Sequence, residues 1–169
     1  ADDELVMLRA AEVTSSARQQ LSQWIHLCET YAQLEEWLDE RRESHVRPVS
    51  RILSTYEDAH KLADDERRRL DLGVTPGHEL VNALEERLGV KVFSLPLDDG
   101  ISGASVVSER FGPVILVNRS HPPGRRTFTL AHEFFHLLAR GRVARAGGQK
   151  TLHLCEAPRP GEKKDRAEQ

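Results

Sequence analysis

Apolar residues recur at helical spacing through the first half of the chain. Between residues 14 and 43 they fall three and four positions apart, which is typical of one buried stripe along a helix. The stripe consists of Leu21, Trp24, Ile25, Leu27, Cys28, Tyr31, Leu34, Trp37 and Leu38. Arg47-Pro48 interrupts this pattern, because a residue before proline avoids the helical region. Two further helices are predicted at about 50–70 and 77–88.

Beyond residue 89 the apolar positions form shorter segments. Strands are predicted at 90–93, 105–108 and 114–117, with a candidate fourth at 151–155. After the loop from His121 to Gly124, helical spacing returns at about 127–140, with Ala131, Phe134, Phe135 and Leu138 as the apolar back face. The predicted fold class is α+β: a small, mostly antiparallel sheet with one helix bearing the site, preceded by an N-terminal helical region.

These elements divide the chain into two regions. Residues 1–72 are predicted to be a helical N-terminal or connector region, and residues 73–169 a small domain. The long first helix has two interpretations, packing against its own domain or contact within a homodimer. The chain starts without methionine and stops at Glu168-Gln169 without a helix-ending signal. We therefore expect it to be part of a longer protein, with the second region truncated at its C-terminal end.

Composition indicates a soluble protein without a membrane partner. No apolar run approaches the roughly 18 residues that cross a bilayer. The acidic start Ala1-Asp2-Asp3-Glu4 lacks the apolar segment of a signal peptide. Cys28 and Cys155 lie far apart in unrelated contexts, which favours two free thiols over a disulfide. The expected location is the cytoplasm.

Charge is distributed unevenly along the chain. Residues 1–72 contain 16 acidic and 10 basic residues, whereas residues 112–150 contain 7 basic residues and one acidic residue, Glu133. Such a basic segment attracts acidic or phosphate-bearing partners, DNA included. The candidate contact residues are Arg125, Arg126, Arg140, Arg142 and Arg145. Solvated arginines flanking a helix are the alternative interpretation.

The helix predicted at 127–140 contains the pattern H-E-x-x-H, formed by His132, Glu133 and His136. Positions four apart lie one turn apart on the same helix face, so two imidazoles there can share a tetrahedral zinc ion. A carboxylate next to the first histidine can take a proton from a water molecule that the metal activates. The pattern therefore predicts a zinc metallopeptidase-type site. The alternative is two histidines that are four positions apart by chance.

A catalytic zinc ion normally has three protein ligands and one open position. Glu168 is the first candidate for the third ligand, with Glu156 and Glu162 behind it. His153 and Cys155 are zinc-ligand types as well. For each of these residues a solvated or ordinary strand side chain is the competing interpretation, and the residues alone leave the choice open.

The string RTFTLAHEFFHLL, from Arg126 to Leu138, resembles the R-x-F-T-L-A-H-E-x-x-H-L-L signature of the ImmA/IrrE family of metallopeptidases. Residues 84–92, 101–105 and 114–118 look like the family's helix-into-strand entry and the strands before its site helix. The resemblance covers about residues 50–169. In one departure, this chain has Phe135 where many members have glycine before the second histidine. A bulky ring there could narrow the substrate cleft.

The resemblance implies zinc dependence, with His132 and His136 as ligands and Glu133 as the general base. The family's third ligand is a glutamate in an E-x-x-A pattern, which Glu168-Gln169 could open. Known members cleave helix-turn-helix repressors in mobile-element induction or DNA-damage and stress responses. The implied function is therefore a zinc endopeptidase that cleaves such a repressor to switch gene expression. The N-terminal region is similar to the connector of longer members that carry an upstream helix-turn-helix domain.

The sequence also supports a second candidate function, which belongs to a different class. It is a non-catalytic, zinc-containing sensor or DNA-binding module of a transcription regulator, with Phe135 blocking access to the metal. If the chain is instead a peptidase, the strand at 114–117 is expected to pair an extended substrate by β-addition.

Overall fold

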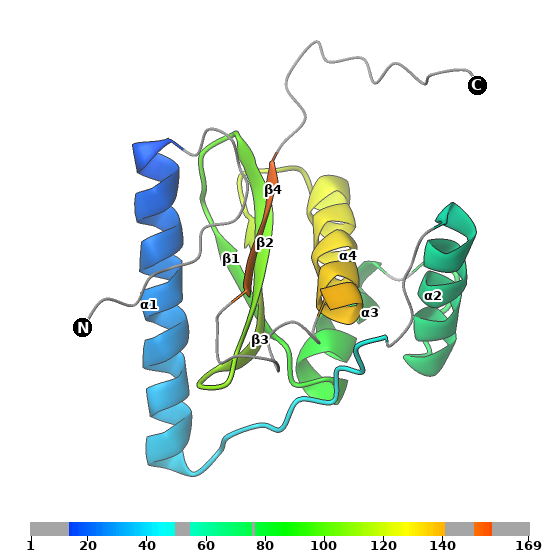
Figure 1. The fold of residues 1–169 in the computed structure, drawn as a ribbon, viewed down its shortest axis with the longest axis horizontal. Helices are drawn as coiled ribbons and strands as arrows, with labels where there is room; N and C mark the ends of the chain where they lie inside the picture. Colours follow the sequence, from blue (N-terminus) through cyan, green and yellow to red (C-terminus); the bar gives the residue numbers. More distant parts are fainter. Residues whose placement is uncertain (1–13, 50–54, 76, 141–150, 157–169) are drawn as a thin grey trace.

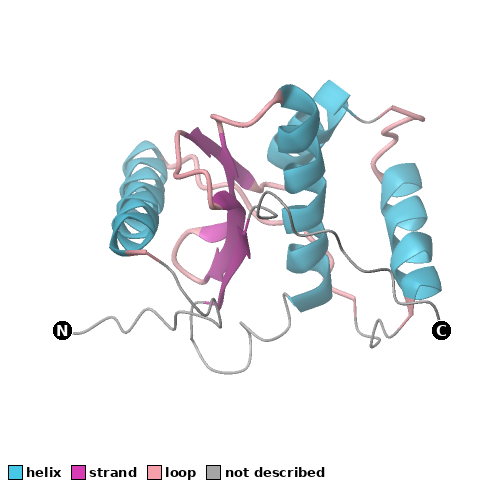
Figure 2. Cartoon of the chain, turned by 90° about the horizontal axis from the view of Figure 1, so that it is seen from above, coloured by secondary structure: helices cyan, strands magenta, loops and turns pink. Residues whose placement is uncertain are grey.

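The computed structural model describes residues 14–49, 55–75, 77–140 and 151–156. The helices are α1 (Ser15–Leu38), α2 (Tyr56–Arg69), α3 (Gly77–Asn82), its π-helical continuation η1 (Ala83–Arg87), and α4 (Pro123–Arg140). The strands are β1 (Lys91–Leu95), β2 (Ile101–Ser108), β3 (Gly112–Asn118) and β4 (Thr151–Glu156). Helix α1 covers one face of the sheet, and α3 and α4 cover the other, with α2 outside them (Figures 1 and 2). The α+β class is confirmed.

The sheet is mixed, with the strand order β1-β3-β2-β4. Strand β1 runs parallel to β3, with Lys91 opposite Val114, whereas β2 runs antiparallel to both β3 and β4. The prediction of a mostly antiparallel sheet was therefore wrong. The reason is that β2 and β3 form a hairpin that docks on β1 through its second strand, so β1 meets a strand of its own direction.

Strand β3 lies between β1 and β2, so both of its edges are already paired. The prediction that the strand at 114–117 pairs an extended substrate was therefore wrong, because β-addition needs an unpaired edge. Among the described strands, β1 and β4 are the outer ones.

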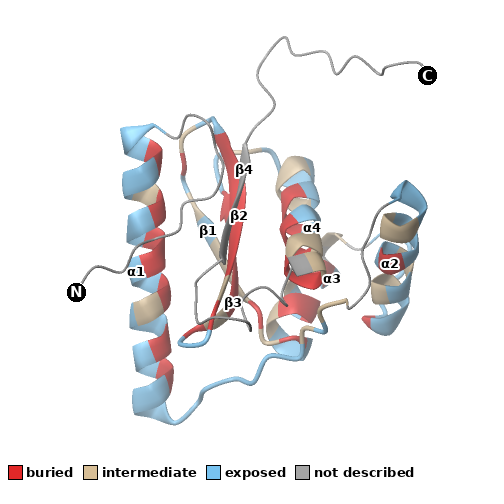
Figure 3. Cartoon of the chain, in the orientation of Figure 1, coloured by how far each residue is buried: buried red, intermediate tan, exposed pale blue. Residues whose placement is uncertain are grey.

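Two apolar clusters fill the two sides of the sheet (Figure 3). Side chains alternate along β3, as a strand requires: Val114 and Leu116 join the cluster under α1, and Ile115 and Val117 join the cluster under α4. The α1 cluster includes Leu21, Trp24, Ile25 and Cys28 from the predicted stripe. The long first helix thus packs against the sheet, and a domain boundary at residue 72 stays a prediction.

Helices α1 and α4 differ from their predicted bounds for local reasons. Helix α1 ends at Leu38 rather than at residue 43, because Asp39 adopts a left-handed conformation (φ 55°) and its N–H bonds back to the carbonyls of Glu35 and Glu36. Helix α4 begins at Pro123, inside the predicted loop. Proline suits the first helical position, where its missing N–H would have no intrahelical partner.

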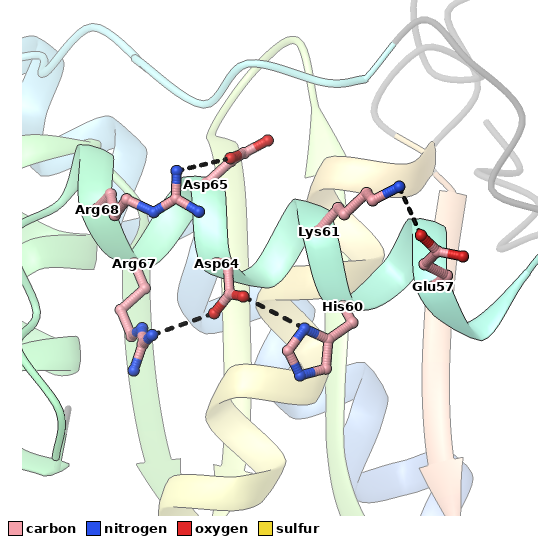
Figure 4. Close-up of polar contacts among 7 residues, drawn as sticks. All are labelled: Glu57, His60, Lys61, Asp64, Asp65, Arg67 and Arg68. Atoms are coloured by element: carbon pink, nitrogen blue, oxygen red, sulfur yellow. Dashed lines mark hydrogen bonds and ion pairs between the residues drawn. The ribbon is translucent and has the colours of Figure 1, made fainter.

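Helix α2 carries ion pairs along its surface (Figure 4). The sequence suggested Glu57 with Lys61, and their charged atoms are 2.7 Å apart. Asp64 contacts both His60 and Arg67, at 3.3 and 3.1 Å. Such exposed pairs stabilise a helix by only a few tenths of a kcal/mol each. Among the described helices, none combines the length and apolarity needed to cross a bilayer.

Candidate metal centre on helix α4

Helix α4 packs against β2 and β3 through one apolar face. Its buried apolar residues are Leu130, Phe134, Leu137 and Leu138. The predicted back face included Ala131 and Phe135, but Ala131 is exposed and Phe135 is only half-buried. The helix is therefore rotated relative to the predicted face, and this rotation brings the motif's glutamate against the sheet.

His132 and His136 are brought together on the outer side of α4. His132 is exposed, His136 is half-buried, and their Nε2 atoms are 3.0 Å apart. Two nitrogens about 2.05 Å from one tetrahedral zinc ion would be about 3.3 Å apart, so the pair fits a shared metal ion. Desolvation by the neighbouring side chains lowers the pKa of His132, which favours the neutral imidazole that binds metal. The spacing argument for this pair agrees with the geometry, and its role as a ligand pair stays a prediction.

Two aromatic rings flank the histidine pair. Phe128 stacks on His132, with ring centroids 6.1 Å apart and planes 29° apart, and is 71% exposed. Phe135 meets His136 edge-on at 6.3 Å and also packs against the cluster under α4. Phe128 was missed in the sequence, although it lies four positions before His132 and so one turn away on the same face.

Glu133 points to the sheet and is fully buried. Its Oε2 accepts a hydrogen bond of 2.6 Å from the hydroxyl of Ser105, a β2 residue that is 2% exposed. Gly103, two positions earlier on β2, lies against Thr129 of α4: a Cβ on Gly103 would lie 2.6 Å from the Thr129 Cγ2 atom. Gly103 therefore allows α4 to approach β2 closely. Neither Gly103 nor Ser105 was singled out as a site residue in the sequence.

Within the residues that the structure describes, no third metal ligand is found at the histidine pair. Glu162 and Glu168 lie outside the described residues. The backbone register of β4 places His153 opposite Ser105 and Cys155 opposite Gly103, and Glu156 ends the strand. Over the described residues, no group of three or more His, Cys, Asp or Glu side chains could hold a metal ion. The third ligand stays a prediction.

The candidate basic residues are spread along α4. Arg125 and Arg126 lie in its first turns, and Arg140 is its last residue, about 20 Å further along the axis at 1.5 Å per residue. Arg125 donates to the hydroxyl of Ser102 at 3.2 Å. Burial, and then the charge of Arg125, lower the pKa of His121 just before the helix. Arg142 and Arg145 lie outside the described residues.

A family model described as peptidase M78, IrrE N-terminal-like domain, matches residues 85–157. This interval begins within η1 and contains all four described strands and α4. It includes His132, Glu133 and His136 and ends before Glu162 and Glu168. No curated protein and no solved structure matches the chain.

Proposed function

We propose that the chain is a zinc-dependent endopeptidase of the ImmA/IrrE family, because residues 85–157 match the family model of the peptidase M78, IrrE N-terminal-like domain. The observation that carries the proposal is the 3.0 Å separation of the Nε2 atoms of His132 and His136. A hydrogen bond between the two rings would give a similar distance, so metal content is the first test.

Each residue of the motif has a defined role in this proposal. His132 and His136 would hold the zinc ion through Nε2, and Glu168 would complete the protein ligands. When bound, zinc would supply a Lewis acid that polarises the peptide carbonyl and acidifies water. The carboxylate of Glu133 takes a proton from the attacking water and passes it to the amide nitrogen. The water oxygen bonds to the carbonyl carbon, and the C–N bond breaks.

We further propose that the substrate is a helix-turn-helix transcriptional repressor, so that cleavage switches gene expression in a stress response. The support for this substrate is the resemblance of the sequence from Arg126 to Leu138 to peptidases that act on such repressors. An extended substrate segment would pair with β4, which is an outer strand among those that the structure describes. This strand lies next to β2, which carries the Ser105 contact to Glu133.

A non-catalytic, zinc-containing sensor or DNA-binding module is the second candidate. Arg125 and Arg126 favour it, because they lie at the N-terminus of α4, where the helix dipole also attracts phosphate. The ring of Phe135 favours this second candidate as well. It lies beside His136 and would restrict access to a metal ion held by His132 and His136. Binding to DNA that weakens with salt, without cleavage of any partner, would support this candidate.

The test uses the full chain, loaded with zinc, beside Glu133→Gln and His136→Ala. Glutamine keeps an oxygen that can accept from Ser105, so the first variant should fold. We expect about one zinc ion per chain in the parent and in Glu133→Gln, and much less in His136→Ala. Mass spectrometry of a proteome-derived peptide library, and of purified helix-turn-helix repressors, should find new termini with the parent alone. Equal cleavage by Glu133→Gln would refute the mechanism.

A further inference from the structure

The contact between Ser105 and Glu133 is a buried polar contact at the interface between α4 and β2. Both residues are almost completely shielded from solvent, at 2% and 0% exposure. Burying a carboxylate without hydrogen bonds is costly, so a donor at this position matters. The 2.6 Å separation from the Ser105 oxygen to Oε2 is typical of a hydroxyl donating to an ionised carboxylate.

Gly103 and Ser105 meet α4 as a matched pair of contacts. Along the helix, Thr129 and Glu133 are four residues apart, a rise of about 6 Å. Along β2, Gly103 and Ser105 are two residues apart, about 6.6 Å. Because the spacing along the helix matches the spacing along the strand, both contacts form together: Gly103 lies against Thr129, and Ser105 bonds to Glu133. A Cβ on Gly103 would also lie 3.5 Å from the Glu133 Cγ atom, so the stem of the glutamate runs along the strand.

We propose that Ser105 is a positioning residue for Glu133, a role that rests on the proposed peptidase function. The terminal torsion of a glutamate is broad, so burial of its stem alone does not determine how the carboxylate is turned. A hydrogen bond from Ser105 to Oε2 sets the orientation of the carboxylate, on the same helix that carries His132 and His136. A base that moves a proton must be held within a few tenths of an ångström, which a contact from a rigid strand provides.

A purely structural role makes a different prediction, since the same hydrogen bond could only tie α4 to β2. Removing it would then lower stability without changing how Glu133 acts on a ligand. Ser105→Ala removes the donor, and Ser105→Thr keeps it in a residue that suits strands. Ser108→Ala is the matched control, because Ser108 is also buried on β2 and its hydroxyl accepts from the backbone of Arg110 instead.

The experiment compares the four proteins as full chains loaded with zinc. The measurements are zinc content, the thermal unfolding midpoint, kcat and KM on the library peptide that the parent cleaves fastest, and the Kd of acetohydroxamate. This chelator binds zinc and donates to a neighbouring carboxylate, so it reports the position of Glu133 without turnover.

We expect Ser105→Ala to keep its zinc and a KM within about twofold. Its kcat should fall roughly 10- to 100-fold, as for other groups that orient a metal site, and its acetohydroxamate Kd should rise. Ser105→Thr should restore both values, and Ser108→Ala should change neither.

Parental kcat and parental acetohydroxamate affinity in Ser105→Ala would overturn the proposal. A loss that follows loss of zinc or of folded protein, without recovery in Ser105→Thr, would overturn it as well. If the parent binds zinc and cleaves nothing, the proposed function fails, and the acetohydroxamate affinities still decide whether Ser105 orients Glu133. If the parent chain binds no zinc, both the proposed peptidase function and the positioning role of Ser105 are refuted.

Discussion

Replacing Gly103 with alanine would place a methyl group between β2 and α4. Its carbon would lie 2.6 Å from the Thr129 Cγ2 atom and 2.6 Å from the Leu116 carbonyl oxygen. Carbon atoms in contact are normally 3.5 to 4.0 Å apart, so the helix must retreat by about 1 Å. The Leu116 oxygen belongs to the neighbouring strand β3 and cannot rotate away as a flexible side chain could.

The expected cost of this substitution is about 1–3 kcal/mol in the free energy of unfolding, which is usual for overpacking a core. At about 2–4 °C per kcal/mol for a chain of this size, the unfolding midpoint should fall by roughly 2–12 °C. A retreat of 1 Å would also lengthen the 2.6 Å contact from Ser105 to Glu133 beyond hydrogen-bond range. Zinc content and peptide cleavage should then fall more than stability alone explains.

The assay is thermal and urea unfolding followed by circular dichroism, with zinc content measured on the same samples. Gly100→Ala is the matched control, because a Cβ there would meet nothing within 4 Å. The double variant with Thr129→Ser removes the clashing methyl group and should recover part of the loss. If Gly103→Ala unfolds within about 0.5 kcal/mol of the parent, α4 does not pack on β2 as closely as described.

Three further predictions concern α1 and the strand beside it. Burial raises the pKa of the Cys28 thiol to about 12, so at pH 8 a Cys155→Ser chain should react with a thiol reagent only after unfolding; fast labelling of the native chain would contradict this. Lys91 forms an ion pair of 3.0 Å with Glu35, and their side chains are 11% and 10% exposed. Lys91→Ala should therefore cost about 3 kcal/mol in urea unfolding, and the double variant with Glu35→Gln should cost less; additive losses would refute the pairing. If α1 mediates a homodimer, Trp37→Glu should shift sedimentation to the monomer, because Trp37 is 72% exposed on the outer side of that helix; an unchanged dimer would place the interface elsewhere.

Local geometry explains why parts of the site could be predicted. The positions of His132 and His136 differ by four, and any α-helix places such residues one turn apart, whatever the rest of the fold does. The helix itself was predicted from apolar spacing, and only its first turn was missed, because Pro123 reads as a loop residue when its place at a helix start is unknown.

The other features of the fold and of the site could not be predicted, because they depend on contacts between residues that are distant in the sequence. Strand β3 presents the same alternation of apolar residues whether it lies at an edge or in the centre, so the order β1-β3-β2-β4 and the parallel pair could not be read from it. Leu130 and Ala131 are both apolar neighbours on α4, and only packing against the sheet decided that Leu130 is buried. The sequence thus determined the helix and its pair of histidines, because those depend on spacing along a single element. Only the tertiary structure decided that Glu133 accepts a hydrogen bond from Ser105. That contact depends on how closely α4 approaches β2, which Gly103 allows.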